Sequence, residues 1–339
     1  MHSPPPSSFS VDSPRVGVVG AGAAGALCAR MLTDRGLSVV VFDKGRGAGG
    51  RMSTRRIDAA RFDHGAQFFT ARDPQLAPRI EQWERAGIVQ RWEGPFVRIE
   101  SGRVVPETPV EPRWVAKPGM NALVKHLLSG LDVRFGQRAM AVRRRGQTWQ
   151  VELDNESSAV FDLVVIAIPA PQAVALLTEV PSLRESMGAV RAAPCWAAMF
   201  NGTGRPGPSW AAAKVDDPTI SWIARNETKP DRPSAPQWVV HASPQWSRAH
   251  LEDSAATVKV ALAAETARII GEDHLAGDGW AHRWRYALVE TPVGVPCLLE
   301  SEVGVCGDGL LGGRVESALL SGAALAQRVL AMARPTPAS

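Results

Sequence analysis

Apolar residues in this chain follow two patterns, short continuous runs and runs with helical spacing. One continuous run ends at Val19, and a second, LSVVVFD, ends at Asp43. Runs of this kind are typical of strands buried in a parallel sheet. Between them, Leu27, Met31 and Leu32 recur at helical spacing, which predicts a helix. The first part of the chain is therefore expected to form a β-α-β unit.

The same patterns divide the rest of the chain. We expect helices within 75–87 and 119–130, a hairpin about Ser101–Gly102, and two strands joined by a turn at Gly146. The run DLVVIAIPAPQAVALL predicts a buried strand and a helix that begins at a proline. From 180 to 296 strands predominate, with one helix near 254–271. The segment 303–330 then predicts a strand, a glycine turn and a long helix.

The turn after the first strand carries the glycine pattern of a dinucleotide site. Gly20, Gly22 and Gly25 fit G-x-G-x-x-G, in which glycines make a tight turn, admit a pyrophosphate and let the helix pack closely. The N-terminus of the helix then faces the phosphates. Asp43, about 20 residues further on, has the position of an acid that binds ribose hydroxyls and repels a 2′-phosphate. NAD and FAD remain as candidates.

A second glycine cluster, GRGAGGRMST, directly follows the second strand and favours FAD. A nicotinamide dehydrogenase needs no further glycine-rich stretch here, whereas a flavin protein buries a longer and more rigid ligand. Arg51 can donate a bidentate hydrogen bond to pyrophosphate oxygens. The alternative is a solvated basic loop, because several other basic residues lie in this stretch.

Near the other end, an apolar strand runs into Gly307–Asp308 and a glycine turn opens a long helix. Such a helix N-terminus suits the ribityl chain or the N1–C2=O edge of a flavin. Asp308 would accept a hydrogen bond from a ribityl hydroxyl, and its alternative role is helix capping. Both ends of the chain are therefore expected to close one FAD site.

These elements predict an α/β fold in which a Rossmann-type (glutathione-reductase-like) FAD domain is interleaved with a mixed-sheet substrate domain. The 339 residues suffice for two domains. We assign 15–72, 130–178 and 297–333 to the FAD domain, 73–129 and 179–296 to the substrate domain, and the Pro- and Ser-rich stretch 1–14 to a disordered leader.

Composition and charge argue against several other classes. The formal net charge of +4 is small for this length and the basic residues are scattered, so no nucleic-acid partner is expected. No stretch approaches the roughly 20 apolar residues of a membrane span, and the leader lacks a secretion signal. The four cysteines have no metal-binding or disulfide spacing, which predicts no metal site and a reducing, cytoplasmic location. The sequence leaves the oligomeric state open.

With these motifs in view, the chain resembles the bacterial renalase group within the flavin amine oxidase superfamily. GAGAAG and GRGAGGRMS are shared across the superfamily and specify only FAD. More particular to renalases are DHGAQFFTAR (63–72), WIARNETKP (222–230) and HASPQWSR (241–248). KPGMNAL (117–123), HRWRYA (282–287) and CGDGLLGGRVESALLSG (306–322) also match, so the resemblance runs from about Arg15 to the last helix.

The resemblance implies an oxidase for misreduced nicotinamide dinucleotides. The 2- and 6-dihydro forms of NAD(P) would transfer hydride to N5 of FAD, NAD(P)⁺ would leave, and O₂ would reoxidise the flavin to give H₂O₂. The chain shows no recognisable flavinylation motif, so FAD is expected to bind non-covalently. The sequence does not choose between NAD and NADP forms of the substrate.

The matching segments also imply site residues. We expect Arg225, Asn226 and His241 to orient the substrate and Trp284 to form an aromatic wall. Further substrate contacts are expected from Phe68, Phe69, Thr70, Arg72 and Trp196. The expected FAD contacts are Gly20, Gly22, Ala24, Gly25, Asp43, Lys44, Gly50, Arg51, Met52, Gln67, Phe68, Ala139, Asp308, Arg314 and Val315. The alternatives are a strand role for His241, core roles for Trp196 and Trp284, and a surface ion pair for Arg72.

One position departs from the family pattern, and two other functions stay open. Bacterial renalases often carry an aromatic residue where this chain has Gly309, and its loss would enlarge the space near the flavin and leave the exact substrate open. An amine oxidase is the first alternative, although a chain whose single tyrosine is Tyr286 cannot build a two-tyrosine amine cage. A non-catalytic flavin-binding protein is the second, but it would need only the FAD motifs.

Overall fold

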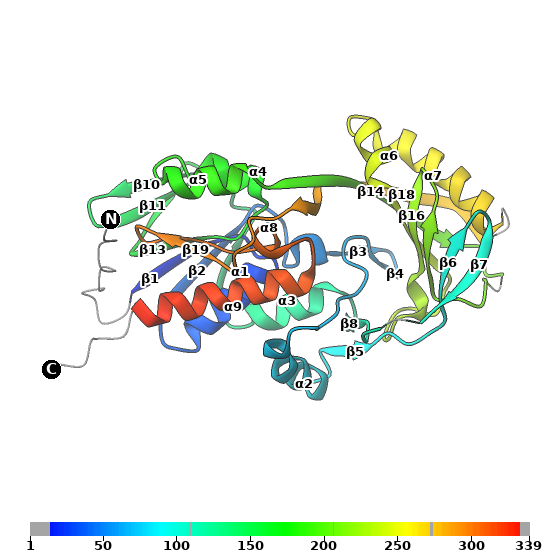
Figure 1. The fold of residues 1–339 in the computed structure, drawn as a ribbon, viewed down its shortest axis with the longest axis horizontal. Coiled ribbons are helices and arrows are strands. Elements are labelled where there is room, and N and C mark those ends of the chain that lie inside the picture. Colours follow the sequence, from blue (N-terminus) through cyan, green and yellow to red (C-terminus); the bar gives the residue numbers. More distant parts are fainter. Residues whose placement is uncertain (1–13, 109, 206, 272–273, 333–339) are drawn as a thin grey trace. The chain divides into compact units, whose positions relative to one another are not determined.

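The computed structural model describes residues 14–108, 110–205, 207–271 and 274–332 (Figure 1). Apart from Pro14, the expected leader lies outside the described residues. The chain forms two compact units. Unit 1 comprises Met1–Gly50, Val124–Arg191 and Val289–Ser339, and unit 2 comprises Arg51–Leu123 and Ala192–Leu288. The expected α/β class, with a Rossmann-type unit and a mixed-sheet unit interleaved along the chain, is confirmed.

The units divide the chain at other residues than the expected domains. Residues 51–72 belong to unit 2, where strand β4 (Ala60–Asp63) packs against β17 (Gln237–Ala242). Residues 124–129 belong to unit 1, because the Leu127 carbonyl in helix α3 (Asn121–Leu128) accepts a 2.9 Å hydrogen bond from Arg30 Nε. The assignment of one part to the cofactor and the other to the substrate stays a prediction.

Unit 1 is built on a six-stranded sheet. Its order is β19 (Leu298–Glu300), β20 (Val303–Val305), β13 (Leu163–Ile166), β1 (Arg15–Val19), β2 (Ser38–Asp43) and β9 (Asp132–Phe135). Only β19 is antiparallel to its neighbour among these pairs. The central strands are continuous apolar runs because both faces of the sheet are covered.

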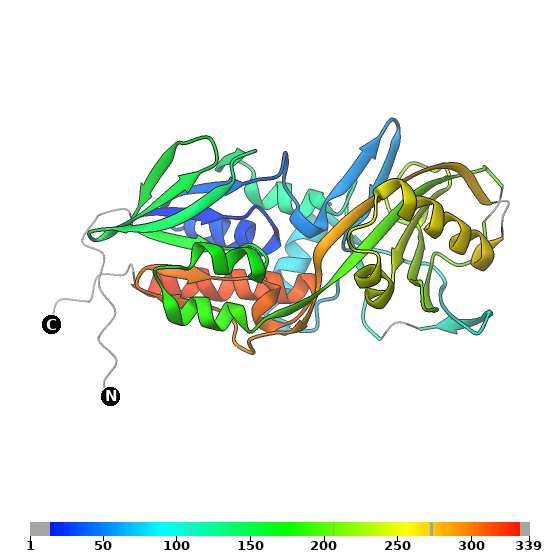
Figure 2. The same ribbon diagram turned by 90° about the horizontal axis from the view of Figure 1, so that it is seen from above.

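Helices α1 (Ala23–Thr33) and α9 (Val315–Met332) pack against each other in unit 1 (Figure 2). A Cβ on Gly322 would lie 2.3 Å from the Ala24 oxygen, so the glycine allows this close contact. One core of unit 1 joins the sheet to a smaller three-stranded sheet and two helices. These elements are β10 (Ala139–Arg145), β11 (Thr148–Leu153), β12 (Ser158–Phe161), α4 (Ala170–Leu176) and α5 (Pro181–Gly188).

Unit 2 is built on a seven-stranded sheet. Its order is β18 (Leu275–Thr291), β14 (Arg191–Gly202), β17, β16 (Ile220–Arg225), β15 (Ala212–Asp216), β6 (Phe96–Glu100) and β7 (Arg103–Glu107). β15 and β6 are parallel, while β14–β17, β17–β16, β16–β15 and β6–β7 are antiparallel. Shorter elements are β3 (Thr54–Ile57), β5 (Val89–Arg91), β8 (Trp114–Ala116) and α2 (Ala77–Arg85).

The two faces of the seven-stranded sheet carry different residues, because side chains alternate along a strand. On one face, Trp196, Ile223 and Val240 belong to a core with α7 (Ala255–Ile270), and α6 (Pro244–Ala249) lies nearby (Figure 1). On the opposite face, Trp222 and His241 are direct register partners on β16 and β17. We call this second side the His241 face.

The pattern-based element predictions are largely confirmed. The β1–α1–β2 unit, α2, α3, the β6–β7 hairpin, α4 and α7 are present, and Gly146 makes the turn between β10 and β11. Helices α5 and α6 were not expected. They have eight and six residues, too short for helical periodicity to stand out. In the described part of the chain, none of the helices combines the length and apolar character needed to span a bilayer.

Candidate functional site

In unit 1, the glycine turn between β1 and α1 leaves open space beside its backbone. Gly20 has φ 116°, and a Cβ on it would lie 2.4 Å from the Ala167 oxygen. A Cβ on Gly25 would lie 2.1 Å from the Gly20 oxygen. Gly22 caps α1, and apart from its chain neighbours no described atom lies within 4 Å of its Cβ position. Pyrophosphate oxygens can therefore approach the free N–H groups of this helix start.

The second glycine cluster lies directly against the first. The Gly49 N–H donates to the Ala21 oxygen at 3.1 Å. Gly50 has φ 54°, and its Cβ position is 3.4 Å from Gly22 Cα. The chain carries two clusters because both form the same backbone cradle in unit 1.

Asp43 joins the two glycine turns. Its Oδ2 accepts from the Ala21 N–H at 2.7 Å and its Oδ1 from the Gly45 N–H at 2.6 Å. A carboxylate oxygen can accept a second hydrogen bond, so a ribose contact stays a prediction. The Lys44 side chain is exposed, although some loss of solvent around its ammonium group and the charge of Arg138 lower its pKa.

The C-terminal motif also lies in unit 1. Gly307, with φ 146°, donates its N–H to Ser321 Oγ at 2.8 Å. Asp308 is 8 % exposed and begins the short helix α8 (Asp308–Leu311). Val315 begins α9, and Arg314 before it is exposed. Of the other expected cofactor residues in unit 1, Ala24 is buried in the first turn of α1 and Ala139 begins β10.

Gly309, where the chain departs from the family pattern, lies beside apolar residues of unit 1. A Cβ on Gly309 would lie 3.6 Å from Met187 Cε and 3.8 Å from both Ala170 Cβ and Val190 Cγ1. These residues of α4, α5 and the turn after α5 would be in ordinary van der Waals contact with it. A larger space near the flavin at this position stays a prediction.

Unit 2 begins with a close backbone contact at Arg51. The Ala66 N–H donates to the Arg51 oxygen at 2.8 Å, and a Cβ on Gly65 would lie 2.0 Å from that oxygen. The Arg51 side chain is partly buried, with Nη1 3.4 Å from the Tyr286 oxygen, and Met52 is buried. Only glycine at position 65 leaves room for the Arg51 oxygen and for its hydrogen bond with the Ala66 N–H.

Gln67 connects His241 to a buried cation. Its Oε1 accepts from Lys229 Nζ at 3.1 Å, while its Nε2 donates to the carbonyls of Asp63 and Gly65. This orientation is fixed by chemistry, because an ammonium group can only donate. Gln67 Nε2 lies 3.4 Å from His241 Nε2. Burial and the charge of Lys229 lower the pKa of His241 to about 4, so this imidazole is neutral at neutral pH.

Asp63 is the anion of this network and is completely buried. Its Oδ2 accepts from Arg232 Nη2 at 2.7 Å and Lys229 Nζ at 3.3 Å. Its Oδ1 accepts from Thr54 Oγ1 at 2.7 Å and the Met120 N–H at 2.9 Å. Burial alone would raise the pKa of Asp63, but Lys229 and Arg232 outweigh it and lower the pKa to about 2. Burial lowers the pKa of Lys229 to about 8 against the attraction of Asp63.

Phe68 lies in an aromatic cluster beside the His241 face. Its ring centroid is 5.8 Å from that of Trp222 and 6.4 Å from that of Trp92. The Arg113 guanidinium carbon lies 4.7 Å from the Phe68 ring and 4.0 Å from the Phe96 ring. The cluster therefore combines flat apolar surface with a buried cation.

Trp284 lies in a second aromatic group with two histidines. Its ring stacks on His64 at 5.1 Å and 26°, and its Nε1 donates to the His64 oxygen at 3.0 Å. His282 lies 4.3 Å from the Trp284 ring and 4.8 Å from the His64 ring. Burial, with smaller effects of His282 and Arg55, lowers the pKa of His64 to about 3. The His64 ring is therefore uncharged at neutral pH.

The structure does not bring Arg225 to His241. Arg225 is the register partner of Trp238 on the other face of the sheet, because it lies an odd number of residues from Trp222 along β16. Its guanidinium bonds the Pro208 oxygen and pairs with Glu227 at 2.9 Å. The expectation of one pocket lined by Arg225, Asn226 and His241 is therefore corrected for Arg225.

Trp196 also lies away from the His241 face. It is 2 % exposed, belongs to the core under α7, and donates from Nε1 to the His250 oxygen at 2.9 Å.

Asn226 is completely buried. Its Nδ2 donates to the Arg61 oxygen, and its Oδ1 accepts from the Asp63 N–H at 3.4 Å. Its amide holds β4 in place.

The remaining expected substrate residues follow Phe68. Phe69 is 3 % exposed and pairs with Trp114 in an isolated bridge. Arg72 forms a 3.1 Å ion pair with Glu111, and Thr70 is partly exposed. The surface alternative for Arg72 is thus the one that the structure shows.

Sequence reasoning missed the residues that support this site. They are His64, Trp92, Arg113, Trp222, Lys229, Arg232 and His282, together with Asp63. Several lie in segments that resemble renalases, but only the three-dimensional fold brings 63, 229 and 232 together. In the stretch RFDHG only Phe62 beside Asp63 is apolar, so the local pattern does not mark this carboxylate as buried.

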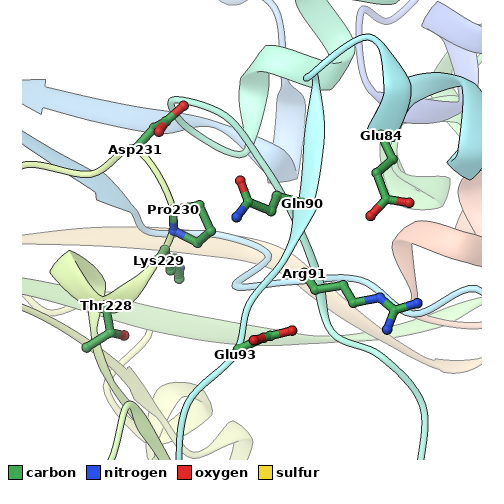
Figure 3. A pocket seen from close by; sticks show the side chains of 8 residues that line it. All are labelled: Glu84, Gln90, Arg91, Glu93, Thr228, Lys229, Pro230 and Asp231. Carbon is green, nitrogen blue, oxygen red and sulfur yellow. The ribbon is translucent and has the colours of Figure 1, made fainter.

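A pocket of about 500 Å³ lies elsewhere in unit 2 (Figure 3). Its lining residues are Glu84, Gln90, Arg91, Glu93, Thr228, Lys229, Pro230 and Asp231. Most are polar or charged, and the Lys229 ammonium bonds Asp63 and Gln67. None of the residues expected to bind substrate is among this lining, so we do not place the substrate there.

Comparisons with known proteins agree with this arrangement. A model of "NAD(P)-binding Rossmann-like domain" matches residues 18–82, and one of "Flavin containing amine oxidoreductase" matches residues 102–198. Renalase from Mus musculus is 26 % identical over 301 residues, covering 82 % of this chain and 86 % of the mouse protein.

Solved structures show the same fold. A putative protoporphyrinogen oxidase from Exiguobacterium sp. 255-15 has a TM-score of 0.77 at 12 % identity, covering 94 % of this chain and 99 % of that one. A putrescine oxidase bound to putrescine has a TM-score of 0.67 at 15 % identity with the same coverage.

The two family models and the mouse relative support a renalase-like member of the flavin amine oxidase superfamily, and hence a flavin oxidoreductase. The family implies a flavin cofactor, FAD, and the paired glycine turns of unit 1 fit its pyrophosphate, because they leave open backbone N–H groups beside a glycine whose Cβ position is empty.

Proposed function

We propose that this protein is an FAD-dependent oxidase of misreduced nicotinamide dinucleotides. Its substrates are the 2- and 6-dihydro forms of NAD(P), its products are NAD(P)⁺ and H₂O₂, and FAD binds non-covalently. FAD, when bound, supplies the hydride acceptor and the site of reoxidation by O₂. The resemblance to renalases and the likeness to the mouse renalase support this assignment.

The protein's own task is to bind and orient the two dinucleotides. In unit 1, Gly20, Gly22 and Gly25 admit the pyrophosphate of FAD, and Asp43 binds the ribose hydroxyls. Arg51 supplies a bidentate donor to the phosphates. The segment with Gln67 and Phe68 lies on the His241 face and contributes the flavin and substrate contacts of unit 2.

The single observation that carries the proposal is the neutral imidazole of His241 beside Trp222 and Gln67 on one sheet face. A neutral, polar group bordered by aromatic rings suits an uncharged dihydronicotinamide ring and its carboxamide. A protonated amine would need a carboxylate or an aromatic cage. Hydride transfer needs the donor carbon about 3–3.5 Å from the acceptor atom, so the role of His241 is to hold the ring in place.

An amine oxidase is the second candidate, favoured by the shared fold with a putrescine oxidase. The experiment that separates the two measures O₂ uptake by the purified holoenzyme with each dihydro-NAD(P) isomer and with a panel of amines. The proposal expects O₂ uptake with the 2- or 6-dihydro isomers and matching H₂O₂. Uptake with amines alone would assign the protein to the amine oxidases, and none with any donor would favour a flavin-binding protein without turnover.

A further inference from the structure

Two of the buried hydrogen-bond donors in unit 2 that have no partner in the described structure lie in one aromatic cluster. They are Nη1 of Arg113 and Nε1 of Trp222. Arg113 is 5 % exposed and Trp222 is 8 % exposed. Because buried donors are paired in the great majority of cases, two orphans in one cluster require an explanation.

Both donors flank the same ring. The Arg113 guanidinium carbon is 4.7 Å from the Phe68 ring centroid and 5.7 Å from the Trp222 ring centroid. The Phe68 and Trp222 rings are themselves 5.8 Å apart. Trp222 is also the register partner of His241, so the donors belong to the sheet face on which the proposed substrate site depends.

The charge around these donors favours an oxygen acceptor. Arg113 Nη2 donates to Glu107 Oε2 at 3.1 Å, and Lys214 Nζ pairs with Glu107 Oε1 at 2.6 Å. One carboxylate is therefore shared by two cations, and the group has one more positive than negative charge. Its anion is fully engaged, which leaves the Arg113 Nη1 side for a ligand.

A second unpaired indole in unit 2 provides an internal comparison. Trp238 Nε1 also has no partner in the described structure, and Trp238 is 1 % exposed. Its ring lies beside those of Trp210 and His274, and Trp238 belongs to the core on the opposite face of the sheet. It has the same indole chemistry as Trp222 but lies away from His241, and the arginine beside it, Arg225, pairs with Glu227 at 2.9 Å.

We propose that Arg113 Nη1 and Trp222 Nε1 form a donor pair that binds an oxygen acceptor of the substrate dinucleotide. The acceptor is the carboxamide carbonyl of the nicotinamide or a phosphate oxygen. The Phe68 ring lies beside both residues and provides a flat surface next to them. This inference rests on the proposed function and adds the residues that recognise the polar end of its substrate.

The test records the indole N–H resonances of the FAD-loaded protein labelled with ¹⁵N-tryptophan. The Trp222 and Trp238 resonances are assigned as those lost in Trp222→Phe and Trp238→Phe. The protein is titrated with NAD⁺, with nicotinamide and with ADP-ribose. A shift of the Trp222 resonance with nicotinamide supports the carboxamide as acceptor, and a shift with ADP-ribose but not nicotinamide supports the phosphate.

Affinity gives the second readout. Trp222→Phe keeps the aromatic ring but loses the donor, so its dissociation constant for NAD⁺ should rise roughly tenfold. Trp238→Phe, the matched control, should bind NAD⁺ as the parent does. Arg113→Gln should also weaken binding. A Trp222 resonance that does not move with any ligand, or a Trp222→Phe variant with parental affinity, would overturn the donor pair.

Failure of the proposed function would look different. In that case the parent flavin would not be reduced by the dihydro isomers, whatever the indole resonance does. A moving Trp222 resonance would then keep the donor pair for another ligand with an oxygen acceptor. An unmoved resonance in a protein that the isomers do reduce would reject the donor pair alone.

Discussion

Asp63 and Lys229 form an ion pair with a 3.3 Å Nζ–Oδ2 distance and no solvent exposure of either side chain. Arg232 binds the same carboxylate oxygen at 2.7 Å. Two cations around one anion leave a net positive charge inside unit 2, next to the amide that faces His241. This relationship makes Asp63 the residue on which the site of unit 2 depends most.

Asp63→Asn should strongly destabilise the protein. Removing one partner of a buried charge group leaves the others uncompensated, at a cost of about 3–5 kcal/mol. Urea unfolding measures the change. The matched control is Glu100→Gln, which breaks the exposed pair with Arg98 and should change the free energy of unfolding by less than about 1 kcal/mol. Equal effects of the two variants would contradict the assigned role.

Acid should destabilise the protein through His64 and His241. Burial lowers their pKa values to about 3 and about 4 from an ordinary 6.5. Between pH 4 and 6.5 the unfolded chain therefore binds more protons than the folded one, so the free energy of unfolding falls as the pH drops through this window.

His64→Phe tests this sign. Each group should contribute about 2 kcal/mol of lost stability between pH 7 and pH 5. The variant should therefore show a flatter pH dependence of urea unfolding than the parent. An identical slope in both proteins would show that His64 is not the neutral, buried base that the structure describes.

Arg51→Lys should weaken FAD binding. The substitution keeps the charge but loses the bidentate fork, at a cost on the order of 1–3 kcal/mol of cofactor affinity. Equilibrium titration of apoprotein with FAD gives the dissociation constant. Arg56→Lys, an exposed neighbour on β3, is the control. If Arg51→Lys binds FAD as tightly as the parent, Arg51 does not contact the pyrophosphate.

His241→Ala should slow reduction of the flavin without changing FAD affinity. Misplacing the hydride donor by a small distance can cost roughly 10²-fold in rate. Anaerobic stopped-flow measures the reduction step by itself. His250→Ala removes a histidine that pairs with Asp253 away from this face and should leave the rate unchanged. An unaltered rate in His241→Ala would remove His241 from the substrate site.

The sequence was sufficient where one local pattern determines one local structure. The glycines at 20, 22 and 25 require a tight turn before a helix, and the continuous apolar runs require buried parallel strands. The position of Asp43 followed from the same β-α-β unit. These features depend on neighbours within about 30 residues, as does the hairpin at Ser101–Gly102.

What the sequence did not show depends on distant contacts. Asp63 meets Lys229 and Arg232 only after unit 2 has folded. Arg225 and Asn226 are adjacent in sequence to residues of the His241 face, but the alternation of β16 turns Arg225 to the opposite side. A motif identifies a segment as relevant, whereas the register of the strand decides which of its side chains reach the site.

The most direct test of the central claim is anaerobic mixing of the FAD-loaded protein with the 2- and 6-dihydro isomers of NAD(P), followed by the visible absorbance of the flavin and by assay of the product. We expect one equivalent of an isomer to bleach the flavin and to yield one equivalent of NAD(P)⁺. We expect no bleaching by amines such as putrescine. Bleaching by an amine, with a flavin that stays oxidised in the presence of both isomers, would contradict it.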